Sequence, residues 1–245
     1  MPIQFRTRKP KRPTYRKKTK KTTTTMVTRR RFARQKVPRN ITPARMFLNL
    51  KWNHFNSTSL VDSGFHNTYR LNSIYDPNYT ATGSGEPNSQ PTGYDQLAAL
   101  YQKYKVHTAI IRVNYINDTQ AATVVTFSAM DGNQRSTNMY EVSRRRNQFH
   151  TILQGSNSNG HANTTKSIKR KYYMRSILAK TKEQFRTSES VSADIGANPT
   201  DEVLLDIQQW LMSNPTSTSD QTFQYELKLI QFVEFFEPVY LATSE

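Results

Sequence analysis

Basic side chains at the N-terminus are the groups in this chain best suited to binding chemistry. The sequence has 245 residues and a formal net charge of +17, and residues 1–45 hold 17 Lys and Arg and no acidic residue. Cations concentrated in this way neutralise phosphates, so we expect this stretch to bind nucleic acid irrespective of base sequence. The candidate residues are Arg6, Arg8, Lys9, Lys11, Arg12, Arg16, Lys17, Lys18, Lys20, Lys21, Arg29, Arg30, Arg31, Arg34, Lys36, Arg39 and Arg45.

The same 45 residues are predicted to form an arm without fixed structure. Like charges repel one another, few apolar residues are present, and five prolines between Pro2 and Pro43 prevent a long helix. Basic clusters of this kind also serve as nuclear localisation signals. The alternative is a tail that only improves solubility, which rarely needs 17 uncompensated charges.

A second basic region lies at residues 144–186, which contain eleven basic residues and one acid. Part of it interleaves cations with flat aromatic rings, a combination that can hold phosphates while unpaired bases stack. The alternative is that the region contacts the acid-rich residues 187–245, within one subunit or between two. The candidate secondary patch comprises Lys166, Lys169, Arg170, Lys171, Tyr172, Tyr173 and Arg175.

Patterns that would indicate catalysis or metal binding are missing from the sequence. The chain has no Cys, its five His are scattered, and it contains neither a nucleophile elbow nor a P-loop. No apolar run approaches the roughly 18 residues that cross a membrane. We therefore expect no catalytic residue, no metal, no cofactor and no membrane insertion.

Residues 46–245 carry 18 basic and 18 acidic residues and read as an all-β folding unit. Apolar side chains alternate with period two through most of the strand candidates. Residues 201–213 fit a helical stripe as well as a strand, and a short helix is predicted at 94–103. The strand candidates are 46–56, 67–75, 104–117, 122–130, 149–153, 167–178, 201–213 and 222–237. This set suits an antiparallel sandwich or barrel, including a jelly roll.

A specific pattern occurs at residues 70–106. It consists of RLNSIYDP, a loop rich in Gly, Pro and Ser, and YDQLAALYQKYKV. The pattern resembles the capsid proteins of circovirus-like, Rep-encoding viruses with circular single-stranded DNA. The arm departs from the best-known circoviruses, because it mixes Lys and Thr where those have nearly pure Arg runs. The matching positions are Asn72, Ile74, Tyr75, Asp76, Pro77, Pro91, Gly93, Tyr94, Asp95, Tyr101, Tyr104 and Val106.

The resemblance implies a single eight-stranded antiparallel jelly roll over residues 46–245, with 201–213 as a strand and 1–45 as the arm. It implies a capsid protein in which about sixty copies form the smallest icosahedral shell around single-stranded DNA. It also implies transport by host nuclear import receptors, so that the protein occurs in the virion and in the host nucleus. Exposed Lys and Arg would suit a host-surface receptor such as a sulfated glycosaminoglycan.

Two other functions fit the same charge distribution. The chain could be the jelly-roll capsid protein of a small RNA virus, since phosphates do not distinguish the sugar. It could also be a cellular nucleic-acid-binding protein with a basic tail. For a shell of about sixty copies, the arms would supply on the order of a thousand positive charges, enough to neutralise much of a small genome.

Overall fold

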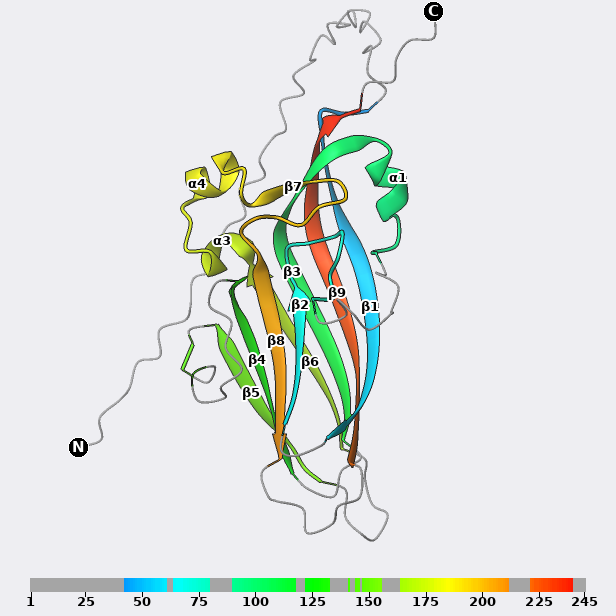
Figure 1. Cartoon of the computed structure of the whole chain (residues 1–245), viewed down its shortest axis with the longest axis vertical. Helices are drawn as coiled ribbons and strands as arrows, with labels where there is room; N and C mark the ends of the chain where they lie inside the picture. Colours follow the sequence, from blue (N-terminus) through cyan, green and yellow to red (C-terminus); the bar gives the residue numbers. More distant parts are fainter. Residues whose placement is uncertain are drawn as a thin grey trace, which may run out of the picture. The chain divides into compact units, whose positions relative to one another are not determined.

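Two antiparallel sheets form the part of the chain that the computed structural model describes (Figure 1). These residues belong to a unit spanning Asn40–Glu245. Apart from Arg45, the predicted nucleic-acid-binding residues of the arm lie outside the described residues. The described residues are 42–60, 64–79, 90–117, 122–132, 141, 144–145, 147–155, 164–211 and 221–239.

The first sheet has the strand order β1-β9-β3-β6, and a short strand, β7, pairs with β3 beside this path. Its strands are β1 (Arg45–Leu60), β9 (Gln221–Pro238), β3 (Tyr101–Asn117), β6 (Thr164–Tyr173) and β7 (Ser192–Asp194). The second sheet has the order β2-β8-β4-β5. Its strands are β2 (Gly64–Arg70), β8 (Val203–Leu211), β4 (Thr123–Asp131) and β5 (Gln148–Leu153).

The chain crosses repeatedly between these sheets, which is the connectivity of a jelly roll. The strand β1 lies in the first sheet, β2 in the second, β3 in the first, and β4 and β5 in the second. The chain then returns with β6, crosses with β8 and returns with β9, and every pairing is antiparallel. The predicted eight-stranded antiparallel jelly roll is confirmed, with β7 as an addition to it.

Alternating side chains of the long strands build the core between the two sheets. On β3 the side chains of Ala109, Ile111 and Val113 are fully buried, as the period of two predicts. They lie beside β9, where Ile111 pairs with Leu229 and Val113 with Leu227. The hydrophobic effect therefore fixes the register of the central pair, because a slip by one residue would expose these side chains.

The ambiguous segment at 201–213 forms strand β8, as the resemblance implied. All residues from 203 to 209 are buried, including Gln208 and Gln209 on opposite faces. A strand that is buried on both faces does not alternate between apolar and polar residues. This explains why the pattern alone favoured neither helix nor strand.

Three short helices correct or add to the predicted elements. The helix predicted at 94–103 is only α1 (Tyr94–Ala98), because strand β3 begins at Tyr101. The strand predicted to run to residue 178 ends at Tyr173, where helix α3 (Met174–Ile177) begins. Helix α4 (Lys182–Thr187) was not predicted, although it starts with a capping box formed by Thr181 and Gln184.

The strand predicted at 67–75 is displaced towards the N-terminus. Strand β2 ends at Arg70, and the chain from 71 to 74 is buried without alternation. The backbone there accepts and donates hydrogen bonds outside the ladder, for example from Leu71 N to the Val203 carbonyl at 2.8 Å. This buried segment belongs to the motif at residues 70–106.

Candidate nucleic-acid interface

Arg45 is the one predicted arm residue within the described part of the chain. It is the first residue of β1, and its Nη1 donates to Glu234 Oε1 at 2.9 Å. Its side chain is 57% exposed, whereas that of Glu234 is 9% exposed. Arg45 thus compensates an acidic group of β9, and the binding role predicted for the rest of the arm stays a prediction.

The candidate secondary patch is divided between the two faces of strand β6. The register pairs Ile168 with Val113 and Tyr172 with Ala109, so alternate β6 side chains point towards the core. Tyr172 packs against the core, and burial raises the pKa of its hydroxyl to about 12. The suggestion that Tyr172 offers a face for base stacking is therefore corrected, while Tyr173 remains 54% exposed.

Cations of β6 make aromatic and hydroxyl contacts with neighbouring side chains. The Cζ atom of Arg170 lies 3.8 Å from the centre of the Phe149 ring, on strand β5 of the other sheet. Lys166 Nζ donates to Thr151 Oγ1 on the same strand. Lys171 Nζ lies 4.8 Å from the ring centre of Tyr173. The first two contacts join the edges of the two sheets, and none of the three supplies a negative charge to the cations.

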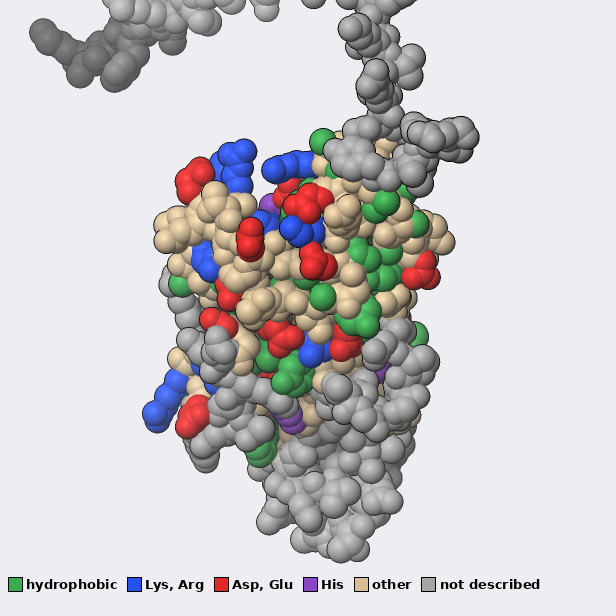
Figure 2. Space-filling view, turned by 45° about the horizontal axis from the view of Figure 1, so that its top comes forward, with side chains coloured by type: hydrophobic (Ala, Val, Ile, Leu, Met, Phe, Trp, Pro, Cys, Tyr) green, Lys and Arg blue, Asp and Glu red, His purple; other side chains and the backbone are tan. Residues whose placement is uncertain are grey.

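The basic region 144–186 and the acidic region 187–245 meet at the Lys180–Asp201 ion pair, where Nζ lies 2.9 Å from Oδ2. Other acids of the second region pair elsewhere: Glu202 with Arg70, and Glu237 with Lys103. Acidic and basic side chains are interspersed over the end of the unit that comes forward in Figure 2. Among the described residues, ion pairing between the two regions is therefore limited to this place.

Asp201 should contribute stability that disappears in acid. A hydrogen bond from Ser190 and the nearby Lys180 hold the pKa of its carboxyl below the ordinary value of 3.8. A carboxyl with a lowered folded pKa stabilises the fold above the unfolded pKa, and this contribution is lost as the pH falls through the folded pKa. We expect Asp201→Asn to be less stable than the wild type at pH 7, with a difference that shrinks below about pH 4.

Urea unfolding at pH 7, 5 and 3 would measure this difference. Asp95→Asn is the matched control, because it makes the same charge change at an exposed position in the first turn of α1. A gap between Asp201→Asn and the wild type that stays constant down to pH 3 would contradict the assigned role of the ion pair.

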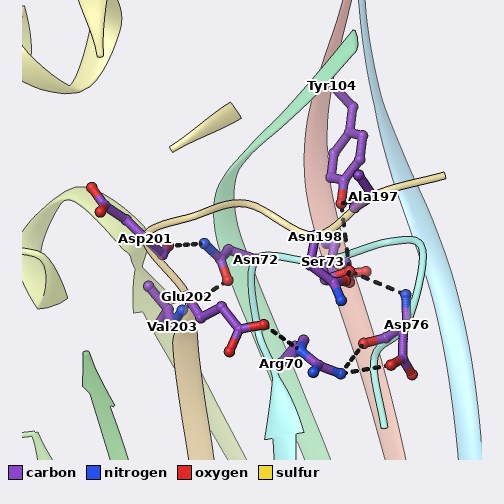
Figure 3. Close-up of polar contacts among 11 residues, drawn as sticks. Arg70, Asn72, Ser73, Asp76, Tyr104, Ala197, Asn198, Asp201, Glu202 and Val203 are labelled. Atoms are coloured by element: carbon purple, nitrogen blue, oxygen red, sulfur yellow. Dashed lines mark hydrogen bonds and ion pairs between the residues drawn. The ribbon is translucent and has the colours of Figure 1, made fainter. Parts of the chain in front are cut away.

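The motif residues near position 70 form a buried polar network (Figure 3). Arg70 lies between two carboxylates: its Nε donates to Glu202 Oε1 at 2.6 Å, and its Nη1 to Asp76 Oδ2 at 2.6 Å. The Arg70 side chain is only 10% exposed and that of Asp76 is 13% exposed. One charge-assisted hydrogen bond therefore ties the end of β2 to the residue before β8, and the other ties it to the loop that follows β2.

Asn72 and Tyr104 extend this network across the chain (Figure 3). Asn72 donates to the Asp201 carbonyl at 2.7 Å and accepts from Val203 N at 2.8 Å, replacing two strand-like hydrogen bonds. The Tyr104 hydroxyl donates to the Ala197 carbonyl at 2.8 Å, and Ser73 donates to Asn198 at 2.6 Å. These bonds satisfy polar groups that would otherwise be buried without a partner.

The second half of the motif positions helix α1. Gly93 adopts a φ of 88° at the N-terminus of the helix, a left-handed conformation that favours glycine. The buried Tyr94 accepts a hydrogen bond from Gly196 N at 2.9 Å. Tyr75 packs against the core and the Pro77 carbonyl accepts from Arg70 N, whereas Asp95 is exposed. The motif therefore specifies folding contacts, and most of its side chains are unavailable to a ligand.

Several residues of this network were not singled out from the sequence. Gln231 of β9 is fully buried and donates to the Leu71 carbonyl at 2.9 Å and the Ser73 carbonyl at 2.7 Å. Glu202 and Asn198 also lie far from the motif in the sequence. Gln231 stands in phase with the apolar residues of β9, and a polar residue at such a position was the available signal.

Comparison with known proteins gives similarities of structure alone. No family model and no curated protein matches the sequence. The Desmodium yellow mottle tymovirus structure is 13% identical, with 83% of this chain and 94% of that chain covered and a TM-score of 0.43. The Macrobrachium rosenbergii nodavirus semi-empty particle is 12% identical, with 83% of this chain and 100% of that chain covered and a TM-score of 0.44. The decameric BFDV capsid protein is 11% identical, with 78% of this chain and 98% of that chain covered and a TM-score of 0.41. The strand order of this chain, rather than these similarities, assigns its fold.

The described residues include neither a metal-binding cluster nor a membrane-spanning helix. They contain no group of three or more His, Cys, Asp or Glu side chains placed to hold a metal ion. None of the helices in this part of the chain is long and apolar enough to span a membrane.

Proposed function

We propose that this chain is a viral capsid protein with a structural, non-enzymatic role. In this proposal the jelly-roll domain assembles into a small icosahedral shell, and the basic arm packages the nucleic acid inside it. The observation that carries the proposal is the combination of a jelly roll with a separate basic arm. The arm holds all of the charge surplus, while residues 46–245 hold equal numbers of basic and acidic residues.

The boundary between the two functions is proposed to lie near residue 45. Strand β1 begins at Arg45, and its Nη1 bond to Glu234 is part of the folded domain. The Tyr101 hydroxyl also donates to the Pro43 carbonyl at 3.1 Å. Residues 46–245 would then form the shell domain, with a few residues before them anchored to it.

The proposed cargo is circular single-stranded DNA. The sequence resemblance at residues 70–106 supports this choice, whereas the charge of the arm suits any polynucleotide. Packaging of RNA by a jelly-roll capsid protein of a small RNA virus is equally consistent with the fold and the arm. The identity of the cargo therefore has to be measured on extracted nucleic acid.

Nuclear import and attachment to the host cell are further parts of the proposal. The clusters before residue 40 have the composition of nuclear localisation signals, so import receptors are proposed partners. Exposed Lys and Arg side chains on the outer surface of the shell could bind a sulfated glycosaminoglycan on the host cell. The protein would thus occur in the virion and, during assembly, in the host nucleus.

Electron microscopy of the purified full chain tests the central claim. We expect uniform closed particles in at least one combination of salt and pH, and nucleic acid that DNase removes after the particles are opened. Cargo sensitive only to RNase would favour the RNA-virus alternative. A monomer or dimer under all conditions, bound to one structured RNA, would instead indicate a cellular nucleic-acid-binding protein.

A further inference from the structure

A groove crosses the first sheet beside helices α3 and α4, with a volume of about 540 Å³. We call it the α4 groove, and its lining combines aromatic rings with basic side chains. Its volume lies within the range of roughly 300–1,000 Å³ that is usual for ligand sites. The residues lining it are Arg45, Phe47, Lys105, His107, Thr108, Tyr173, Arg175, Lys182, Phe185, Arg186, Glu234 and Phe236.

Aromatic rings provide flat surfaces in this groove. Phe47 on β1 is 52% exposed, although a large apolar side chain on a strand is usually covered. Its ring centre lies 6.0 Å from that of His107, which lies 5.6 Å from that of Phe185 on α4. Tyr173 is also more than half exposed. Phe47 and Tyr173 can therefore accept the face of another planar group, whereas Phe185 is only 5% exposed and packs in the core.

The one carboxylate among the described residues that line the groove is already compensated. Glu234 accepts from Arg45 Nη1 at 2.9 Å, and its second oxygen lies 2.8 Å from His107 Nε2. Lys105 has a structural role, because its Nζ donates to the carbonyls of Phe185 and Arg186 at 3.2 Å and 3.1 Å. Burial lowers the pKa of this lysine.

Three exposed cations therefore stand at the groove without an acidic partner among the described residues: Arg175, Lys182 and Arg186. Lys182 and Arg186 are four residues apart on α4, a spacing at which like charges lie close and repel. A bound anion would remove this repulsion. The charge of the groove thus complements an anionic ligand with a planar apolar part.

We propose that the α4 groove binds an unpaired nucleotide of single-stranded nucleic acid. Its base would stack on Phe47 or Tyr173, and its phosphate would contact the three exposed cations. This combination of rings and cations is how proteins hold single strands without reading their sequence. The inference rests on the proposed function only in taking nucleic acid as the cargo, and it places a second binding site on the shell domain, apart from the arm.

Photocrosslinking of the full chain tests the site despite the strong binding expected of the arm. The protein is mixed with a short oligodeoxythymidine containing 4-thiothymidine, irradiated and digested, and the adducts are located by mass spectrometry. We expect adducts on peptides that contain Phe47 or Tyr173, besides adducts on arm peptides. Adducts confined to the arm would overturn the inference.

Two variants make the test specific for the groove. Lys182→Glu combined with Arg186→Glu reverses the charge of α4, and Phe47→Ala removes an exposed ring, so neither disturbs the core. Each should lower the yield of groove adducts by about tenfold, as loss of a stacking or phosphate contact does for single strands. Lys51→Glu is the matched control, since Lys51 is exposed on β1 outside the groove. Equal losses in the control and the variants would contradict the proposed site.

The experiment also separates this inference from the proposed function. Particles that contain nucleic acid but give no groove adducts would refute the inference and leave the capsid proposal intact. Groove adducts on a protein that never forms particles would support the inference and refute the capsid proposal. If a lysine crosslinker joins Lys182 to a second copy and groove adducts are missing, the groove is a subunit interface and the inference fails.

Discussion

Removal of residues 2–41 is expected to produce particles that assemble but contain little nucleic acid. The deletion removes 16 of the 35 basic residues and none of the 18 acidic residues, so 19 basic residues remain and the net charge falls from +17 to +1. Because binding to a polyanion depends on the number of phosphates neutralised, we expect the packaged nucleic acid to fall by about tenfold or more.

The end point of this deletion follows from contacts at the start of β1. Pro43 accepts a hydrogen bond from Tyr101, and Arg45 pairs with the largely buried Glu234. A deletion that extended to residue 45 would leave Glu234 without Arg45, and it would mix a folding defect with a packaging defect. Keeping residues 42–45 therefore separates the two effects.

The measurements are particle yield by electron microscopy and the ratio of absorbance at 260 nm to that at 280 nm. A full-length variant with the arm sequence shuffled is the matched control, because it keeps composition and charge, and sequence-independent binding predicts normal packaging. Unchanged cargo after the deletion would mean that the shell domain holds the genome. Loss of particles would mean that the arm is needed for assembly.

Replacement of Arg70 by Met is expected to cause a large loss of stability. Removal of Arg70 leaves Asp76 and Glu202 without their shared cation, and the Asp76 side chain is only 13% exposed. Breaking a buried ion pair by removing one partner usually costs about 3–5 kcal/mol of unfolding free energy. We expect a cost of that order, together with reduced particle yield.

Urea unfolding of dissociated subunits measures the cost. Arg70→Lys should recover only part of it, because an ammonium group does not reproduce the planar fork of the guanidinium. Lys103→Met is the control, since Lys103 pairs with Glu237 where both side chains are well exposed, and we expect no measurable change. A similar urea midpoint for Arg70→Met and Lys103→Met would show that the network does not support the fold.

The sequence predicted the strands best where one face alone is buried. Alternation located the buried positions of β3 and β9 because their opposite faces carry polar residues. It could not assign β8, whose residues from 203 to 209 are all buried. It extended the strand ending at Tyr173 too far, because Met174 is fully buried in α3 and continues the apolar pattern.

The motif at residues 70–106 illustrates a second limit. Its residues were recognisable as a pattern, yet the pattern did not reveal what they contact. Arg70 and Glu202 lie 132 positions apart, and Asn72 bonds to residues 129 and 131 positions away. Their structural role became visible only when the end of β2 and the start of β8 were seen side by side.

The sequence by itself determined the division between a basic arm and a neutral folding unit, because charge depends only on which residues follow one another. It also determined the all-β class through the period of its apolar residues. The tertiary structure decided which cations are paired, which rings are exposed and which residues from β1, β3, β9 and α4 form one groove. Burial and ion pairing depend on which distant segments meet, and local sequence does not contain that information.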